Sequence, residues 1–346
     1  MGEKLYTEHP DRAVEDPRFS HMMAIALDPS TENRRGVIRC ITSREGDVEV
    51  KGYIDRSKLF TVSGDSLEHF SVGEELQIKN TNEIVGQLRV EGLDFLGLED
   101  PDIWRDENTR LIHLYFTMPF ISRNKPDEES LIHLGHAVGR DLDSLEMTMP
   151  VLQASQVNYK SAGAKEVSIA PINSKGFRFN LFEGHNKLHE DDEDVYSTVR
   201  IAVAKDMGEE WDFGETVFHP GKAHIPWIGG HSSPGPLFSK NFIDIGKEKL
   251  LGVINGREAN KHVDGKTIYG MFSVGLFIYD YENGKIDWVS PEPLIQDSEA
   301  KTITFASQFV ETGKGEGILY AHVDDSFVRA YTLKVEDLKS LLPNNT

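Results

Sequence analysis

The residues of this chain best suited to acid–base chemistry lie in the run Gly97–Ile103, which reads Gly-Leu-Glu-Asp-Pro-Asp-Ile. A proline forces extended backbone on the residue before it, so Asp100 is predicted to project its carboxylate from the mouth of a strand. Carboxyl groups that are buried close together have raised pKa values, and one of them can then act as a general acid near neutral pH. The alternative is a solvated acidic turn before an edge strand.

Short apolar runs between turn signals predict the elements that hold this segment. Strands are expected at Ile103 and from residue 111 to 117, joined by a polar turn over 105–110, and again at 200–204, 249–255, 273–280, 317–323 and 327–333. Short strands at such spacing are typical of a sandwich, a barrel or a propeller. Only the tail, 334–342, has the apolar spacing of a helix.

A loose repeat in the sequence favours a propeller over a sandwich or a barrel. Five units, at about 20–92, 93–157, 158–221, 222–298 and 299–335, each have a polar entry, a strand pair and a pair rich in aromatic residues. We therefore expect an all-β chain that folds as a five-bladed β-propeller. No linker of low complexity divides the 346 residues, so residues 1–346 are expected to form one catalytic domain with a short N-terminal extension and a C-terminal helix.

Composition narrows the class of protein. The formal charge of −20 argues against nucleic acid and anionic membranes as partners, because both require a basic face. No apolar run approaches the roughly 20 residues of a membrane span, and the first ten residues have no apolar signal-peptide core. The single cysteine, Cys40, excludes an internal disulfide and any Cys-rich metal site. We expect a soluble, cytoplasmic protein.

The run Gly97–Ile103 resembles the Glu-Asp-Pro-Arg-Ile segment of glycoside hydrolase family 130, five-bladed propellers that cleave or phosphorolyse β-mannosides, and more weakly that of related five-bladed furanosidases. Further matches follow in the family's order over about residues 90–335. The third-blade pattern of Lys, Pro, Gly and a functional side chain is matched by Lys165, Pro171, Gly176 and Glu183. Residues 235–237 and 250–256 are similar to the fourth-blade Gly-x-Pro stretch and its Leu-Leu-x-x-Tyr-His-Gly strand, and residues 319–324 lie where the family has Tyr-Gly-Ala-Ala-Asp.

The resemblance implies roles for three residues. Asp100 matches the catalytic acid, which protonates the glycosidic oxygen directly or through a sugar hydroxyl. Lys165 matches a basic residue that contacts phosphate in the phosphorylases, and Asp324 matches a carboxylate that hydrogen-bonds the sugar. The alternatives are a surface lysine at Lys165 and a turn-capping aspartate at Asp324, together with Asp325.

Two departures from the family pattern favour hydrolysis. Asp102 and Glu183 stand where the phosphorylases carry arginine, and carboxylates repel the phosphate that the guanidinium fork would bind. A carboxylate in such a position can instead activate water, as in an inverting hydrolase. Glu183 is the first candidate for this base, Glu258 the second and Glu166 the third, and the alternative for Glu183 is an ion pair with Arg178 or Lys187.

Other polar residues are expected to shape the pocket. His231 and Ser232 could face sugar hydroxyls and Trp227 could stack on a sugar, with His21 and Asn180 as lesser candidates. No histidine spacing indicates a metal site, so no metal and no cofactor are assigned. The residues assigned to substrate binding are Glu99, Asp102, Lys165, His231, Asn255, Arg257 and Asp324.

These observations predict an inverting glycoside hydrolase that acts on a mannoside-containing or related oligosaccharide, with Asp100 as general acid. One alternative is a phosphorylase in which Lys165, Arg178 and Arg257 rebuild a phosphate site. Another is a carbohydrate-binding propeller without activity, which would lack a second acid facing Asp100. Terminal extensions in proteins of this family type often support assembly, so a homo-oligomer fits the prediction.

Overall fold

The computed structural model describes residues 4–46, 53–122, 130–154, 161–189, 195–263 and 266–343. Strands dominate these residues, so the predicted all-β class is confirmed. The helical elements are short: η1 (Pro29–Thr31), α1 (Thr81–Leu88), α2 (Pro220–Ala223), η3 (Pro226–Ile228) and α3 (Val335–Lys339). No helix in the described ranges is long and apolar enough to cross a membrane.

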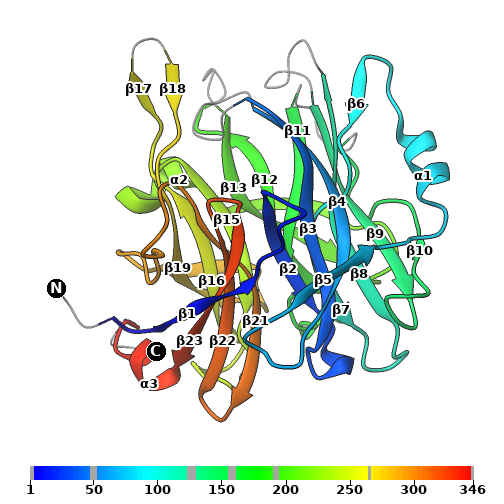
Figure 1. The fold of residues 1–346 in the computed structure, drawn as a ribbon. Helices are drawn as coiled ribbons and strands as arrows, with labels where there is room; N and C mark the ends of the chain where they lie inside the picture. The colour runs from blue at the N-terminus through cyan, green and yellow to red at the C-terminus, as the bar shows by residue number, and fades with distance from the viewer. Residues whose placement is uncertain are drawn as a thin grey trace.

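The strands follow one another in five antiparallel units (Figure 1). The first unit contains β2 (Met22–Leu27), β3 (Arg35–Glu45), β4 (Ile54–Ser63) and β5 (Ser71–Glu75). The second contains β7 (Glu99–Arg105), β8 (Ile112–Ser122), β9 (Ser130–Gly139) and β10 (Glu146–Met147), with β6 (Leu93–Phe95) beside β8. The third contains β11 (Ser161–Ser168), β12 (Arg178–Lys187), β13 (Val195–Ala204) and β14 (Asp212–Phe218). The strands predicted around Ile103 and at 200–204 lie within these elements, and the one predicted at 111–117 begins one residue before β8.

The fourth and fifth units follow in the same order along the chain. The fourth contains β15 (His231–Leu237), β16 (Lys249–Arg257), β19 (Phe272–Asp280) and β20 (Lys285–Val289), and the small hairpin β17 (Lys261–Val263) and β18 (Lys266–Ile268) lies between β16 and β19. The fifth contains β21 (Thr304–Gly313), β22 (Glu316–Val323) and β23 (Phe327–Lys334). The strands named for each unit fall within the boundaries that the sequence repeat predicted, apart from β1 (Thr7–Val14), which joins the fifth unit from the other end of the chain.

Contacts between the units follow the chain. Short parallel pairings of β9 with β11 and of β13 with β15 join the second, third and fourth units into one 13-stranded sheet. The first strands of neighbouring units contact one another: β2 with β7, β7 with β11, β11 with β15 and β15 with β21. β21 in turn contacts β2, so the last unit lies against the first.

The apolar core is divided among the interfaces between consecutive units. Val37 of the first unit and Phe116 of the second belong to one apolar cluster, and Phe182 of the third and Tyr115 of the second belong to another. Similar clusters join the third unit to the fourth, the fourth to the fifth and the fifth to the first. Each fully buried side chain of this size contributes about 1.5–3 kcal/mol, so every unit depends on its two neighbours.

The two ends of the chain differ from the predicted extensions. β1 (Thr7–Val14) is not a separate extension, because it pairs with β23 as the outer strand of the fifth unit. Figure 1 shows this blue strand beside the red C-terminal strand. The predicted C-terminal helix is present as α3, which is shorter than 334–342 and buries Val335 and Leu338.

Each first strand has an irregular register against the second strand of its unit. The interruptions lie at Ala24 in β2, Asp100 in β7, Glu166 in β11, the Pro234–Leu237 segment of β15 and Ser307 in β21. A β-bulge bends the strand and re-aims a side chain. These register breaks therefore all lie in the first strands, which are the strands that contact one another between units.

Candidate active site

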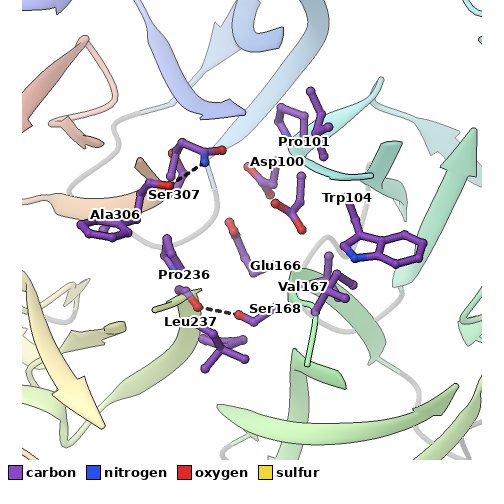
Figure 2. A pocket seen from close by; sticks show the side chains of 17 residues that line it. Asp100, Pro101, Trp104, Glu166, Val167, Ser168, Pro236, Leu237, Ala306 and Ser307 are labelled. Atoms are coloured by element: carbon purple, nitrogen blue, oxygen red, sulfur yellow. Dashed lines mark hydrogen bonds between the residues drawn. The ribbon is translucent and has the colours of Figure 1, made fainter. Parts of the chain in front are cut away.

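A cavity of about 180 Å³ lies among the first strands of the second to fifth units. Figure 2 shows the side chains of Asp100 and Glu166 pointing into it from neighbouring strands. Its wall also contains the indole of Trp104, the hydroxyl groups of Ser168 and Ser307, and apolar side chains. The full lining is Asp100, Pro101, Asp102, Ile103, Trp104, Glu166, Val167, Ser168, Ile169, Pro234, Gly235, Pro236, Leu237, Ala306, Ser307, Gln308 and Phe309.

Asp100 has a left-handed backbone, with φ of 46°, so the extended conformation predicted from Pro101 is wrong. A non-glycine residue in this region costs about 1–3 kcal/mol, which the surrounding structure must offset. The bulge that requires this conformation turns the carboxylate away from the strand ladder and toward the cavity. Only 6% of the side chain is exposed, and its Oδ1 lies 2.7 Å from Nη1 of Arg39.

Arg39, on β3 of the first unit, was missed by the sequence analysis. Its Nη1 donates to Asp100, its Nη2 lies 2.9 Å from Oε1 of Glu99, and its Nε donates to Oγ of Ser57 at 2.9 Å. Ser57 in turn donates to Glu99 at 3.2 Å. A signal was present, because Arg39 interrupts an otherwise apolar run from Val37 to Ile41. A charged residue inside a buried strand must have partners.

A close backbone approach positions this network. Gly97 has φ of 119°, and a Cβ at this position would lie 1.9 Å from the carbonyl oxygen of Ser57. The backbone N–H of Ser57 donates to the carbonyl of Leu96 at 3.0 Å. Glycine is therefore required where β4 meets the segment leading into β7, and this contact sets the place of Ser57 beside Glu99.

Glu183, the first candidate base, is 1% exposed on β12 and lies between the side chains of Lys165 and His231. Its Oε1 is 3.2 Å from Nζ of Lys165, and its Oε2 is 3.1 Å from Nε2 of His231. The expected partners Arg178 and Lys187 are replaced by these two residues. Neither oxygen accepts a well-aligned hydrogen bond within the described part of the chain, and Glu183 does not line the cavity.

Burial raises the pKa of three carboxyl groups in or beside the cavity. The pKa of Glu99 rises to about 7, although Arg39 opposes the shift. The pKa of Asp102 also rises to about 7. For Glu166, burial and the negative charge of Asp100 raise the pKa well above its usual value. Near neutral pH, Glu166 is therefore protonated, and Glu99 and Asp102 are partly protonated.

The pKa of Glu183 is shifted in the opposite direction. Burial by itself would raise its pKa, but the attraction of His231 and Lys165 outweighs this effect, so its pKa is lowered. Burial also opposes the charge of Lys165, yet the carboxylates around it, Glu183 first, raise the pKa of this lysine. Protonated and ionised carboxyl groups therefore stand close together, which is the division that acid–base catalysis needs.

Arg257 lies at the end of β16, opposite His231 in the register of β15 and β16. It is 8% exposed, and its guanidinium lies 4.2 Å from the ring centroid of Tyr269. Among the described residues no carboxylate lies within 4.0 Å of it, and its Nε has no hydrogen-bond partner. Burial lowers the pKa of Arg257, although Tyr269 and Glu183 oppose the shift.

Two predicted substrate-binding residues have structural partners instead. The side-chain amide of Asn255 donates to the carbonyl of Ala306 at 2.9 Å and accepts from its N–H at 2.8 Å, which ties β16 to β21. The carboxylate of Asp324 accepts hydrogen bonds from the backbone N–H groups of Lys301, Thr302 and Ile303. Asp324 therefore caps a loop, as the alternative interpretation held.

The neighbouring residue, Asp325, joins a second charged network that sequence analysis missed. Its Oδ1 lies 3.3 Å from Nε2 of His322, and its Oδ2 lies 3.4 Å from Nη2 of Arg44. Arg44 also forms a two-point ion pair with Asp55, with both N···O distances 2.7 Å. These residues come from the first and fifth units, and the lesser candidate His21 lies 3.4 Å from Arg44.

The remaining candidates lie outside these networks. Glu258 pairs with Lys261 at 3.7 Å and is 45% exposed. Trp227 is buried against Gly256 and Gly275 and donates to the carbonyl of Ser290, so its ring packs in the core. Ser232 donates to the carbonyl of Ser197, and Asn180 accepts from the N–H of Ala170, so both side chains are used in contacts within the protein. Arg178 lies over the ring of Trp104, 5.1 Å from its centroid.

Metal chemistry has no evident ligand set in the described ranges. No group of three or more His, Cys, Asp or Glu residues there is arranged to hold a metal ion. The carboxylates beside Asp100 are instead neutralised by Arg39 and Lys165.

Comparison with known proteins identifies the fold. No family model matches the chain, and no curated protein matches it by sequence. The β-1,2-mannobiose phosphorylase from Listeria innocua, solved with β-1,2-mannobiose, superposes with a TM-score of 0.63 at 13% identity, covering 97% of this chain and 99% of that one. A candidate glycosidase from Bacteroides thetaiotaomicron gives 0.66 at 15% identity, with 95% and 96% covered. A glycosyl hydrolase from Bacteroides ovatus gives 0.63 at 17% identity, with 92% and 85% covered.

At these identities the likeness establishes the fold and not the reaction. It extends over nearly the whole chain, including the first unit, which the sequence motifs did not reach. The resemblance to family 130 in the sequence thus agrees with the structures that this chain is similar to. The chain has the fold of carbohydrate-active proteins of this kind.

Proposed function

We propose that this protein is a glycoside-cleaving enzyme, an inverting hydrolase of a mannoside-containing or related oligosaccharide. The observation that carries the proposal is the pair Asp100 and Glu166, bulge residues of adjacent strands that both point into the central cavity. A binding protein without activity has no need for two such carboxyl groups side by side at the cost of backbone strain. The solved structures with this fold include glycosidases and a mannobiose phosphorylase.

In this mechanism Asp100 gives a proton to the leaving oxygen, directly or through a sugar hydroxyl. A second carboxylate removes a proton from the attacking water on the opposite face of the sugar. Glu183 stays the first choice for this base, because its lowered pKa keeps it ionised and Lys165 lies near both it and Asp100, although Glu183 does not itself line the cavity. Glu166 is the second choice, since it lines the cavity but has a raised pKa that favours the protonated form.

The arrangement of the five units is part of the proposal. We take them as the blades of a five-bladed propeller formed by residues 1–346. Support comes from the cyclic contacts of the first strands and from apolar clusters at all five interfaces between units. The deciding contact is that of β21 with β2, where Ser307 donates to the carbonyl of Ile25 at 3.1 Å. A crystal structure in which this contact is missing would overturn the propeller.

Phosphorolysis is the second candidate, and Arg257 is the observation that favours it. Lys165 and His231 already bind Glu183, whereas Arg257 is a buried cation with no carboxylate within 4.0 Å in the described residues. An oxyanion such as phosphate would compensate its charge. Arg178 does not contribute, because it binds the carbonyl of Ala170 and covers Trp104.

The test is a panel of mannosides and other glycosides incubated with and without inorganic phosphate. Released sugar and consumed phosphate are both measured. A hydrolase releases free sugar at a rate that phosphate does not change, and a phosphorylase forms sugar phosphate only when phosphate is present. No turnover of any glycoside in either condition would overturn the assignment as a glycoside-cleaving enzyme.

Azide distinguishes the two candidate bases. In a variant that lacks the base, a small anion can replace the activated water and restore turnover as a glycosyl azide. We expect azide to rescue Glu183→Ala and not Glu166→Ala or the exposed control Glu258→Ala. Rescue of Glu166→Ala alone would move the base to Glu166.

A further inference from the structure

Glu99 and Asp100 are consecutive residues, and consecutive side chains of a regular strand point to opposite faces. Both nevertheless bind one guanidinium: Asp100 through Nη1 of Arg39 at 2.7 Å and Glu99 through Nη2 at 2.9 Å. The bulge at Asp100, with φ of 46°, is what brings the two carboxyl groups to the same side. All three side chains are at most 12% exposed.

Arg39 comes from a different unit and has no freedom to move within this network. Its third donor, Nε, binds Ser57, which also donates to Glu99. The planar guanidinium therefore has each of its edges occupied, and its plane sets the directions of both carboxylates. Lysine could supply the charge but not these three directed bonds.

We infer that Arg39 is the positioning residue of this site, which holds the Asp100 carboxylate at the cavity and ties it to Glu99 through one shared guanidinium. The predicted effect on turnover rests on the proposed function. The predicted pH dependence of stability rests on the ion pairs alone. Without Arg39, two carboxylates on adjacent residues would face each other with no shared cation. Removing one partner of such a buried group is expected to be strongly destabilising.

Other charged groups surround the pair and must enter the pH argument. Asp55 on β4 and Lys165 on β11 both act on Glu99, and Glu166 on β11 responds to Asp100. Asp325, after β22, lies close enough to Arg39 for its pKa to respond to it. All of these remain in an Arg39 variant, so a change in titration can be assigned to the lost guanidinium.

The sign of the pH effect follows from linkage. Loss of Arg39 removes the charge that opposes the rise in the pKa of Glu99, so this pKa moves further above its unfolded value and the folded protein binds more protons than the unfolded chain. Stability of the variant then falls as pH rises through that range. The difference in melting temperature between wild type and Arg39→Met is therefore expected to be larger at pH 8 than at pH 5.

The experiment compares Arg39→Met and Arg39→Lys with Arg35→Met. Arg35 is a matched control, because it lies on the same strand and pairs with Asp143 of the second unit, but both side chains are exposed. Arg39→Met is expected to lower kcat on the best substrate of the panel by about 10-fold or more, to leave KM within about threefold, and to move a limb of the pH–rate profile upward. Arg39→Lys should fall between, and Arg35→Met should match wild type.

Glu99→Gln keeps the inference testable if Arg39→Met does not fold. It leaves Arg39 and Asp100 paired but removes the carboxyl group whose pKa is raised by burial, so the same limb of the profile should shift and the stability at pH 8 should rise relative to pH 5. An unchanged profile in Glu99→Gln, or Arg39→Met melting with the pH dependence of wild type, would overturn the inference. Failure of the proposed function looks different: no variant or wild type turns over any glycoside, while the melting comparison still gives its answer.

Discussion

Asp100 and Glu166 occupy corresponding places in neighbouring strands. Each is the residue at the register break between the first and second strands of its unit, and their φ angles are 46° and 50°. Ala24 holds the same place in the first unit with φ of 51°. The repeat thus supplies equivalent positions around the cavity, and two of them carry carboxyl groups.

Replacing Asp100 by Asn tests its role as the acid. The amide has nearly the same shape but has no acid proton to give, so turnover is expected to fall by about 100-fold or more. Kinetic assays on the best glycoside and a thermal melt at pH 7 measure the two effects. Asp212→Asn, at an exposed aspartate that begins β14, is the control. A folded Asp100→Asn protein with full activity would remove Asp100 from the mechanism.

Replacing Glu183 by Gln tests the ion pairs with Lys165 and His231. A carboxyl group whose pKa is lowered by folding adds stability above its unfolded pKa of about 4.3, and this stability is lost as pH falls through the folded value. We expect Glu183→Gln to lose about 3–5 kcal/mol at pH 7, with a smaller loss toward pH 3. Denaturant titrations at several pH values measure this. The exposed Glu258→Gln should change stability by less than about 0.5 kcal/mol at any pH.

The contribution of Asp102 to stability has the opposite dependence on pH. Burial raises its pKa to about 7, so stability is lost as pH rises from the unfolded value of about 3.9 through 7. Asp102→Asn, which has no charge to bury, is expected to melt a few degrees higher than wild type at pH 8 and about equally at pH 4. Equal melting temperatures at pH 8 would show that Asp102 is solvated.

Gly97→Ala tests the contact that sets Ser57 beside Glu99. The new Cβ would lie 1.9 Å from the Ser57 carbonyl oxygen, so backbone must move, and we expect a loss of about 2 kcal/mol or more together with lower activity. Gly92→Ala is the matched control. Gly92 also has a positive φ, 85°, but an added Cβ has open space, so its loss should be about 1 kcal/mol without an effect on activity. Equal losses in the two variants would contradict the argument.

Much of the secondary structure could be predicted because it depends on local patterns. Apolar runs bounded by turn residues located strands such as β16, β19, β22 and β23, and the spacing of Val335 and Leu338 located α3. The order of polar and apolar segments also located the five units. β1 was misjudged, because its pairing with β23 joins residues more than 300 positions apart, which no local pattern records.

The candidate site was predicted in part for the same reason. Asp100, Glu166 and Lys165 lie in short sequence motifs from which they could be selected as candidates. Arg39 and Asp325 do not, and each becomes part of the site only through side chains from other units.

By itself, the sequence determined the strands, the repeat and the acidic segment before β8, since each follows from residue types and spacing along the chain. Tertiary structure decided which carboxyl groups face the cavity and which are neutralised. The register break at Asp100 overrides the alternation of side chains along a strand. The positions of Lys165 and His231 beside Glu183 lower its pKa, whereas the pKa of Glu166 is raised. Both effects depend on distances between groups that the folded chain alone brings together.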